Sequence, residues 1–358
     1  MKIKKFLTAM SIATLSTVLV ACGSGTDKGS NPDADQASAT EAKVKATMVT
    51  DQGGVNDKSF NQSAFEGLTE AQDEGKITFR YLESHKEADY PQNLEAALDD
   101  DADIIFTIGY ALYEDTKKSA EANPDQLYAI VDSANLDNVK NLTGITFADH
   151  ENSFLAGYVA GMQTETNNIG FVGGMKSEVI DRFEWGFKAG VKYAARENGE
   201  DIEVQTQYAD SYTDAGKGKS IANQMYQKGA DIIFHASGGT GAGVIEAAKE
   251  NSKYVIGVDR DQQEEAPDNM LLSTIKGVGP AVKEICEEIA EKGDKFESGK
   301  TIPFGLKDGD ALSIKFADNN LVPQEIKDKA DKIRDEIVDG TIEVPQNEKE
   351  FDSMGYKD

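Results

Sequence analysis

Residues 44–71 read VKATMVTDQGGVNDKSFNQSAFEGLTEA, and this stretch decides the fold. Its first seven residues, 44–50, are mostly apolar and β-favouring, which predicts a buried strand. A turn follows at Gly53 and Gly54, and a helical pattern begins near Ser59. A strand, a glycine turn and a helix start together mark the place where an open parallel α/β sheet binds its ligand.

The loop inside this stretch carries short polar side chains around one aromatic ring. Phe60 lies among Asp51, Asn56, Asp57 and Asn61. Glycine-rich phosphate loops use lysine and bare backbone amides, whereas this loop presents acids. It favours a ligand with hydroxyl groups and ring nitrogens. Phe60 could instead belong to the core of the following helix, although its polar neighbours argue against that.

The chain after residue 43 alternates strand and helix patterns in two similar halves. DADIIF at 101–106 is answered by GADIIF at 229–234, and a strand ending in Asp132 is answered by one ending in Asp259. Each half contains runs of β-branched residues that suit strands covered on both faces. The predicted fold class is therefore α/β, with two doubly wound parallel-sheet lobes.

Three late strand patterns predict how the lobes are joined. Residues 270–275, 301–306 and 311–316 read as strands that return between the two halves. Several crossings make a hinge, with the ligand in the cleft between the lobes. We expect an N-terminal lobe at 43–147 plus about 277–308, a C-terminal lobe at 148–276 plus about 309–340, and a polar surface tail at 341–358.

The first 42 residues read as a targeting signal and a tether. Residues 1–22 have a basic start, an apolar middle and the ending LVAC, typical of a signal peptide with a bacterial lipobox. The apolar run is too short and too rich in Ser and Thr for a transmembrane anchor. We expect lipid on Cys22, a flexible tether at 23–42, and a location at the extracytoplasmic face of the cell membrane.

The net charge and the cysteine content argue against several classes of partner and of site. The net charge is −27, and loss of three signal-peptide lysines would bring it to about −30. Such an acidic body is not attracted to nucleic acid or to anionic lipid. Cys286 lies at helical apolar spacing with Val282 and Ile289, so it reads as a buried small hydrophobe. With Cys22 lipidated, no disulfide, metal site or cofactor is expected.

The candidate site is assembled from strand ends, because parallel strands bind ligands at their carboxyl ends. Phe60 and Tyr212 could sandwich a flat base. Asp259 could accept from ribose hydroxyls, with Lys276 as a donor. The acids could instead be turn or helix-cap residues. The full predicted set is Asp51, Phe60, Asn61, Asp132, Tyr212, Gly238, Gly239, Asp259 and Lys276.

Three nearby features have structural interpretations. The glycine run at 238–243 does not match dinucleotide-binding spacing, because Val244 stands where the third glycine is needed, and no P-loop lysine follows. His235 lies inside a buried strand pattern and reads as a packed histidine. Trp185 lies at helical spacing with Ala189, which indicates packing.

Several long motifs, taken together, closely resemble the basic membrane protein family of lipoproteins, in particular its purine nucleoside receptor branch. The motifs are DQGGVNDKSFNQSAFEG, ITFADHENSFLAG, NIGFVGGMKSEVIDRFEWGFKAGV, GADIIFHASGGTGAGV and YVIGVDRDQ. The resemblance runs over residues 44–276, and the lipobox fits it. It implies a type I periplasmic-binding-protein fold and the substrate-binding component of an ABC nucleoside importer. It also implies permease and ATPase partners, a monomer and no enzymatic activity.

The resemblance assigns roles to individual residues. Phe60 is placed on the base, and Tyr212 or Phe183 on its other face, since the family usually has Phe at this second position. The remaining matches are Asp51 and Asn61 at the purine, Asp132 after the fourth strand, and Asp259, Gly238, Gly239 and Lys276 at the ribose.

Two other functions stay open from the residues alone. One is an enzyme acting on nucleosides, such as a hydrolase or phosphorylase, and the other is a surface sensor or adhesin that uses the same cleft. Hydrolysis needs an activated water or a metal, and the chain has only three histidines and no dense Asp/His cluster. The pattern does not rank adenosine, guanosine, inosine and cytidine as ligands.

Overall fold

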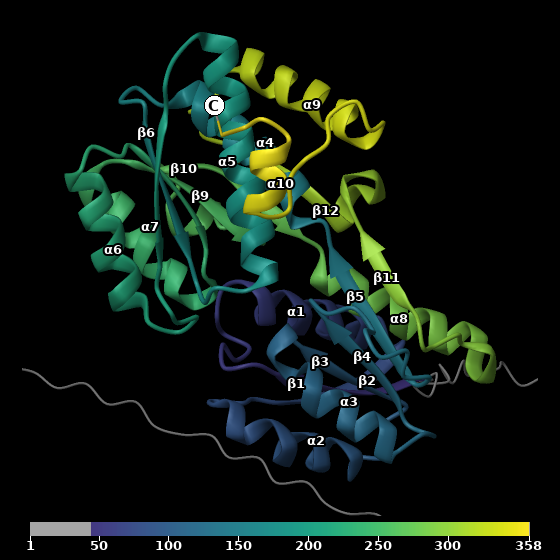
Figure 1. Cartoon of the computed structure of the whole chain (residues 1–358). Helices are drawn as coiled ribbons and strands as arrows, with labels where there is room; N and C mark the ends of the chain where they lie inside the picture. The colour runs from purple at the N-terminus through teal and green to yellow at the C-terminus, as the bar shows by residue number, and fades with distance from the viewer. Residues whose placement is uncertain (1–43, 358) are drawn as a thin grey trace, which may run out of the picture. The chain divides into compact units, whose positions relative to one another are not determined.

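The computed structural model describes residues 44–357, which form two six-stranded sheets with helices on both faces (Figure 1). We call the sheet that starts the chain, with its helices, the N-lobe, and the other sheet with its helices the C-lobe. Eleven of the twelve strands run parallel to a neighbour. The predicted fold class, with two doubly wound parallel-sheet lobes, is confirmed.

The N-lobe sheet is entirely parallel, with the order β11-β5-β4-β3-β1-β2. Helices α1 (Phe60–Asp73) and α8 (Val278–Lys292) pack together on one face, and α2 (Tyr90–Leu98) and α3 (Tyr113–Ala122) on the other. This cover explains why the central strands are continuously apolar. The strands are β1 (Val44–Thr50), β2 (Ile77–Leu82), β3 (Ile104–Ile108), β4 (Leu127–Val131), β5 (Leu142–Phe147) and β11 (Thr301–Phe304).

The C-lobe sheet has the order β12-β10-β9-β8-β6-β7. Helices α4 (Asp149–Gln163) and α5 (Glu178–Asn198) cover one face, and α6 (Ala215–Gln227) and α7 (Gly241–Asn251) the other. The strands are β6 (Asn168–Gly173), β7 (Glu203–Tyr208), β8 (Ile232–Ala236), β9 (Tyr254–Asp259), β10 (Met270–Lys276) and β12 (Leu312–Phe316).

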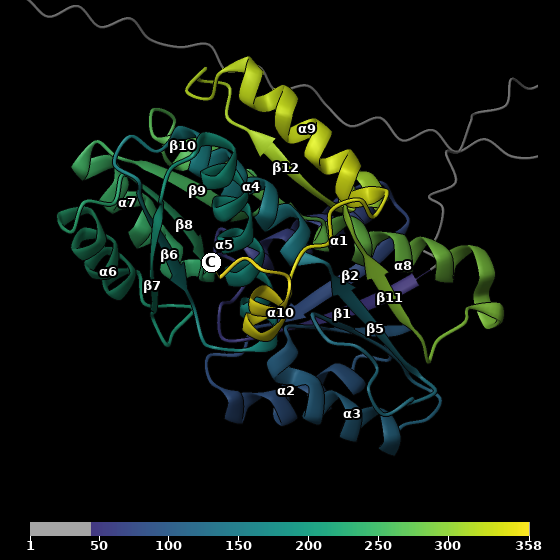
Figure 2. The ribbon, with the colours of Figure 1, turned by 45° about the horizontal axis from the view of Figure 1, so that its top comes forward.

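Strand β12 is the exception to the parallel arrangement, because it runs antiparallel to β10. Its first residue, Leu312, pairs with Lys276, the last residue of β10. The chain therefore re-enters the C-lobe at the end where β10 leaves it, and β12 runs back along β10 beneath helix α9 (Gln324–Val338) (Figure 2).

The chain passes between the lobes after β5, after β10 and again after β11. The last two passages touch, since the Gly277 amide donates to the Ala311 carbonyl at 2.8 Å. Adjacent connecting segments of this kind allow two lobes to move about a shared hinge.

Helix α4 is a central element that the residue patterns above do not predict. Twelve of its fifteen residues are buried, so it has no polar face to give a 3.6-residue periodicity. It packs against α5 through glycines. A Cβ added to Gly157 would lie 2.1 Å from the Phe187 carbonyl oxygen, and one added to Gly190 would lie 2.0 Å from that of Phe154.

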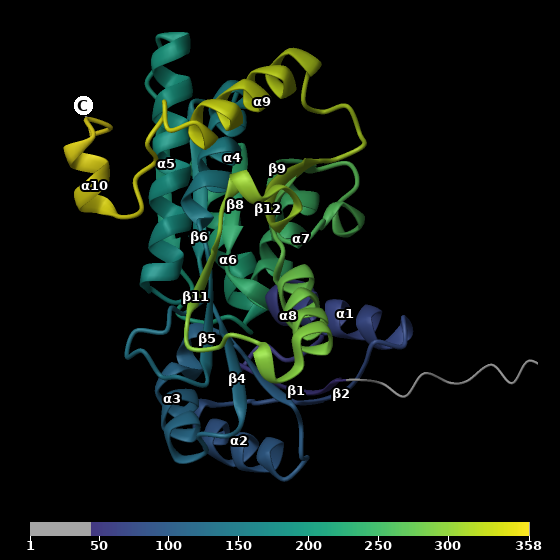
Figure 3. The same ribbon diagram turned by 90° about the vertical axis from the view of Figure 1, so that its right-hand side faces the viewer.

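The tail ends in helix α10 (Glu348–Ser353), which packs beside α5 (Figure 3). Phe351 and Tyr356 are buried and stacked, with ring centroids 5.5 Å apart. The Trp185 ring lies 5.1 Å from that of Phe351. The tail thus has its own apolar anchor on the surface of the C-lobe, which its polar composition did not reveal.

Of the two cysteines, Cys286 lies within the described residues. Cys286 is buried in α8, and burial raises the pKa of its thiol to about 12, which confirms the packed hydrophobe. Cys22 and the tether at 23–42 lie outside the described residues. Within residues 44–357, no helix combines the length and the apolar character needed to cross a bilayer.

Replacing Gly190 by alanine should lower the free energy of unfolding by about 1–3 kcal/mol or more. The added methyl group meets the Phe154 carbonyl and forces α4 and α5 apart. Gly216→Ala is the matched control, because Gly216 is exposed in α6 and its new Cβ meets only the Asp214 carboxylate at 3.4 Å. Urea unfolding with the same midpoint for both variants would contradict this account of the helix contact.

Candidate functional site

A narrow cavity lies between the lobes at the carboxyl ends of their parallel strands. Its volume is about 60 Å³, so little space remains between the opposing walls of the two lobes. Aromatic rings contribute to both walls, which suits a ligand with a flat ring. Its walls are Asp51, Gly53, Asp57, Phe60, Asn61, Gly109, Tyr110 and Asp132 from the N-lobe, and Val179, Ile180, Phe183, Tyr212, Ala236, Ser237, Gly238, Val258, Asp259 and Lys276 from the C-lobe.

The structure brings together eight of the nine residues that strand-end reasoning selects. Gly239 is the ninth, and it lies just behind the wall, against the backbones of Tyr212 and Asp57. Tyr212 and Phe183, the two candidates for the second stacking ring, both line the cavity.

Asp57 organises the loop that carries the N-lobe wall. Its carboxylate accepts from the backbone amides of Ser59 at 2.8 Å, Asn61 at 2.9 Å and Gln62 at 3.1 Å. These amides belong to the start of α1, where helix N–H groups have no helical partner. Asp57 therefore caps the helix and fixes Phe60 at its first position.

The side-chain amide of Asn61 is oriented so that its carbonyl oxygen accepts no hydrogen bond from the protein. Its side-chain nitrogen donates to Asp51 at 2.7 Å and to Asp57 at 3.0 Å. Two carboxylate acceptors fix which end of the amide is which. The buried Oδ1 atom has no protein partner and can accept from a ligand. Burial raises the pKa of Asp51 to about 6, against hydrogen bonds from Gly53 and Asn61 that lower it.

Asp132 and Asp259 occupy matching places in the two lobes, at the ends of β4 and β9. Both have left-handed backbones, with φ of 67° and 68°, a conformation that is uncommon outside glycine and concentrates at functional sites. Asp259 accepts a hydrogen bond from the Ser59 hydroxyl across the lobes. Burial raises the pKa of Asp259 to about 7, although Lys276 and Ser59 oppose the rise.

Lys276 lies at the centre of the charged groups. Its Nζ is 2.7 Å from an Asp132 oxygen and 3.2 Å from an Asp149 oxygen. Burial lowers its pKa, but Asp132, Asp149 and Asp259 outweigh that effect and raise it. The rings of Phe60, Phe147 and Phe183 stand around it, with centroids 5.3, 5.3 and 5.2 Å from Nζ. A cation this buried stays charged only because carboxylates surround it.

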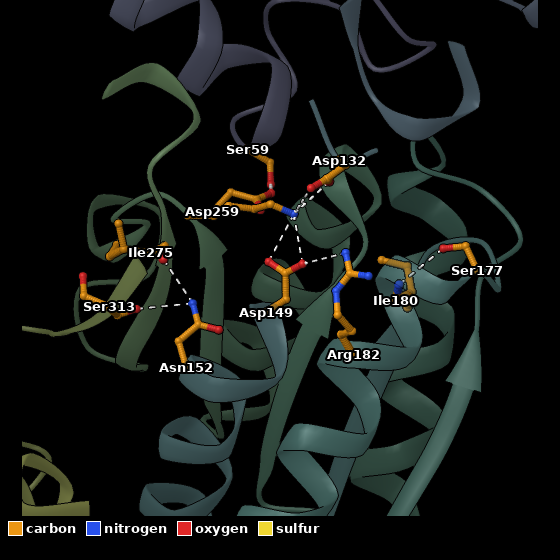
Figure 4. Close-up of polar contacts among 11 residues, drawn as sticks. Ser59, Asp132, Asp149, Asn152, Ser177, Ile180, Arg182, Asp259, Ile275 and Ser313 are labelled. Carbon is orange, nitrogen blue, oxygen red and sulfur yellow. Dashed lines mark hydrogen bonds and ion pairs between the residues drawn. The ribbon is translucent and has the colours of Figure 1, made fainter. Parts of the chain in front are cut away.

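Asp149 is a polar residue of this region that sequence reasoning missed. It is fully buried at the start of α4, and it points toward Asp132 and Asp259 (Figure 4). A signal was present, because Asp149 stands two residues after Phe147, the last residue of β5. The strand-end rule applied to that strand would have selected it.

Two tyrosines meet across the cavity. The hydroxyl oxygens of Tyr110 from the N-lobe and Tyr212 from the C-lobe lie 3.3 Å apart. Tyr212 also donates to the Met175 carbonyl at 3.4 Å. Burial raises the pKa of Tyr212 well above its ordinary value, so its hydroxyl remains a neutral donor and acceptor.

His235 lies behind the wall and is packed, as its strand position predicted. Its Nε2 is 3.1 Å from the Gln262 side-chain oxygen, and its Nδ1 is 3.4 Å from the Ser237 hydroxyl. Burial lowers the pKa of His235 to about 4, so the ring is neutral at physiological pH. Gln262 in turn donates to the Lys58 carbonyl at 3.0 Å, a further link between the lobes.

The cavity combines flat apolar surfaces with an excess of acceptors. Asp51, Asp57, Asp132 and Asp259 line it, and Lys276 is its one lining cation. An additional phosphate would meet like charge in a site shielded from water. The arrangement suits a neutral ligand that has a planar ring and several hydrogen-bond donors.

Comparisons with known proteins agree with this arrangement. A family model described as "ABC transporter substrate-binding protein PnrA-like" matches residues 44–348. The CD4+ T-cell-stimulating antigen of Listeria innocua is 42% identical over 369 residues, covering 97% of this chain and 99% of that protein. The ABC transporter nucleoside-binding protein BmpA of Lactococcus lactis is 40% identical over 367 residues, covering 96% and 99%.

A solved ABC transporter solute-binding protein from Aeropyrum pernix shares the fold. Its TM-score is 0.79 at 24% identity, and the match covers 87% of this chain and 96% of that one. Several elements, then, lead to one family: the two-lobed sheet order, the interlobe cavity and a family match over nearly all described residues. The chain belongs to the PnrA-like substrate-binding proteins of ABC transporters.

Proposed function

We propose that the protein captures nucleosides in the interlobe cavity and delivers them to an ABC importer. Membership of the family supplies the transport role, and one relative bears the name nucleoside-binding protein. The observation that carries the ligand assignment is the cavity itself. It is small, it is flanked by aromatic rings, and it presents buried carboxylates from both lobes beside one lysine.

The sugar is assigned to the carboxylates that end β4 and β9. Asp259 accepts from ribose hydroxyls, and Lys276 donates to a sugar oxygen. Vicinal hydroxyls offer two donors to one carboxylate, and such charge-assisted bonds are strong inside a closed cavity. A free base lacks these groups and gains nothing from Asp259.

The base is assigned to the rings and to the first loop. Phe60 stacks on one face, and Tyr212 or Phe183 lies on the other. The unused Oδ1 of Asn61 and the carboxylate of Asp51 accept from N–H groups at the base edge. The resemblance of these loop residues to purine nucleoside receptors supports purine nucleosides as the preferred class.

The proposed location and partners follow from the leader and the family. Lipid on Cys22 anchors the protein at the extracytoplasmic face of the cell membrane, and residues 23–42 give the lobes reach. The partners are the permease and ATPase subunits of an ABC importer, and the protein acts as a monomer.

The first test compares inosine, hypoxanthine and inosine 5′-monophosphate by calorimetry. Phe60→Ala should weaken the binding of inosine and of hypoxanthine alike, by about 2–4 kcal/mol, because burial and stacking are lost. Asp259→Ala should weaken inosine binding by about 1.5–3 kcal/mol for each hydrogen bond to the ribose that is lost. Hypoxanthine binding should stay unchanged. The monophosphate should bind far more weakly than inosine.

Phe65→Ala is the matched control for the stacking ring. Phe65 lies on the same helix but packs edge-on against Phe79 and Tyr81, away from the cavity. This variant should unfold more easily and keep its affinity for inosine. Equal losses for inosine and hypoxanthine in Asp259→Ala would show that the sugar is wrongly assigned. Release of hypoxanthine during the titration would indicate an enzyme instead.

Affinity for inosine should rise with pH from about 5.5 to about 7.5, because ribose hydroxyls need the ionised form of Asp259. Its pKa of about 7 in the folded protein makes that form scarce at low pH. Asp259→Asn should bind more weakly and lose the part of the dependence centred near pH 7. Titrations at several pH values test this, and an unchanged slope in the variant would contradict it.

The stability of the unliganded protein should change with pH in the opposite direction to the affinity for inosine. Between the ordinary value of 3.8 and about 7, folded Asp259 holds a proton that the unfolded chain has released. This group therefore makes the free energy of unfolding fall as pH rises through that window.

Cys22→Ala should shift the protein from the membrane fraction to the medium, because the lipid is its proposed attachment. Cys286→Ala, which alters only a buried thiol, should stay with the membrane. Immunoblots of washed membranes and culture medium give the distribution. Membrane retention of the Cys22 variant would rule out lipid as the anchor.

A further inference from the structure

The first turn of α4 holds Lys276 from two sides. Asp149 lies 3.2 Å from the Lys276 ammonium nitrogen. Asn152, one turn further along, donates to the carbonyl of Ile275 at 3.0 Å and to that of Ser313 at 3.4 Å (Figure 4). The same helix end therefore contacts both the side-chain tip of Lys276 and the backbone just before it.

Asp149 is in turn held by α5. The Nη2 atom of Arg182 lies 3.4 Å from the second carboxylate oxygen of Asp149. Burial raises the pKa of Asp149, and the two cations Lys276 and Arg182 oppose that rise. Asp149 does not line the cavity, and the lining residue that it contacts is Lys276.

The three hydrogen-bond donors of the Lys276 ammonium are shared between two aspartates and the cavity. An ammonium group has three N–H donors. Asp132 accepts one at 2.8 Å and Asp149 is positioned to accept another at 3.3 Å. The third is left for the cavity, which Lys276 lines. Asp132 belongs to the N-lobe and Asp149 to the C-lobe, so the ammonium is balanced between the two.

Loss of Asp149 would break this balance. Asp132 and Asp259 would then be the remaining carboxylates that act on Lys276. An ammonium drawn into an ion pair with Asp259 would occupy the oxygens that the proposed function gives to ribose hydroxyls. The third donor would also turn away from the ligand.

We propose that Asp149 is a positioning residue for ligand binding, which holds the Lys276 ammonium between the lobes and away from Asp259. Besides the hydrogen bond from Ser59, Asp259 can then accept from the sugar. Arg182 and Asn152 support this role by fixing the Asp149 carboxylate and the backbone before Lys276. This assignment rests on the proposed function for the identity of the ligand. The geometry around Lys276 does not depend on that identity.

The test compares Asp149→Asn with Asp231→Asn. Asp231 is also buried, it accepts from the Thr164 hydroxyl and from the backbone amides of Glu165 and Thr166, and it does not line the cavity. Asp149→Asn should lower the affinity for inosine about tenfold or more and the affinity for hypoxanthine much less. Asp231→Asn should lower the melting temperature and leave the ratio of the two affinities unchanged.

A double-mutant cycle separates positioning from general damage. In a Lys276→Met background, Asp149→Asn should cause no further loss of inosine affinity, because the group it positions is gone. Arg182→Met should act in the same direction as Asp149→Asn and more weakly, and Arg182→Lys should restore much of the loss. The two Arg182 variants test the positioning role even if Asp149→Asn fails to fold. Additive losses in the cycle would overturn the proposal.

A measurement without ligand keeps this inference distinct from the proposed function. The Lys276 ammonium, identified by its absence in Lys276→Met, should give a slowly exchanging ¹⁵N NMR signal in the unliganded protein. Asp149→Asn should move or broaden that signal, and Asp231→Asn should not. If inosine fails to bind the wild type while the signal responds, the ligand assignment falls and the positioning role stands. An unmoved signal with an unchanged inosine-to-hypoxanthine ratio would overturn the role.

Discussion

One buried cation governs the arrangement of this molecule. Lys276 is 2% exposed, and it ends the strand from which the chain leaves the C-lobe. A charge so far from water requires carboxylates close by. Asp132 meets it from one lobe and Asp149 from the other. The approach of the two lobes and the charge balance of the cavity therefore depend on the same few atoms.

Much of the fold and of the site could be predicted, because the local patterns were consistent with one another. The echo between the strands ending in Asp132 and Asp259 indicated two similar units, and both residues share the left-handed backbone at the cavity wall. Asp57 caps α1 and Phe60 lines the cavity, so the spacing of the polar residues around Phe60 indicated where this loop would lie.

The features that escaped prediction share a physical cause, since each depends on contacts between distant segments. Helix α4 is buried on nearly all sides and lacks an amphipathic period, so it left no signal. Asp149 draws its importance from Lys276, which is 127 residues away in sequence. The reversed direction of β12 follows from where the chain re-enters the sheet. Phe351 is anchored by Trp185, a partner that its polar neighbours in the tail do not suggest.

The small volume of the cavity has a kinetic consequence. The cavity volume is only about 60 Å³, so the proposed nucleoside ligand needs the lobes to stand further apart while it enters. Entry must wait for a more open form, and exit must wait for it again. At high ligand concentration the observed association rate should level off at the rate of lobe opening. A partner that pries the lobes apart would then release cargo faster than the isolated protein ever does.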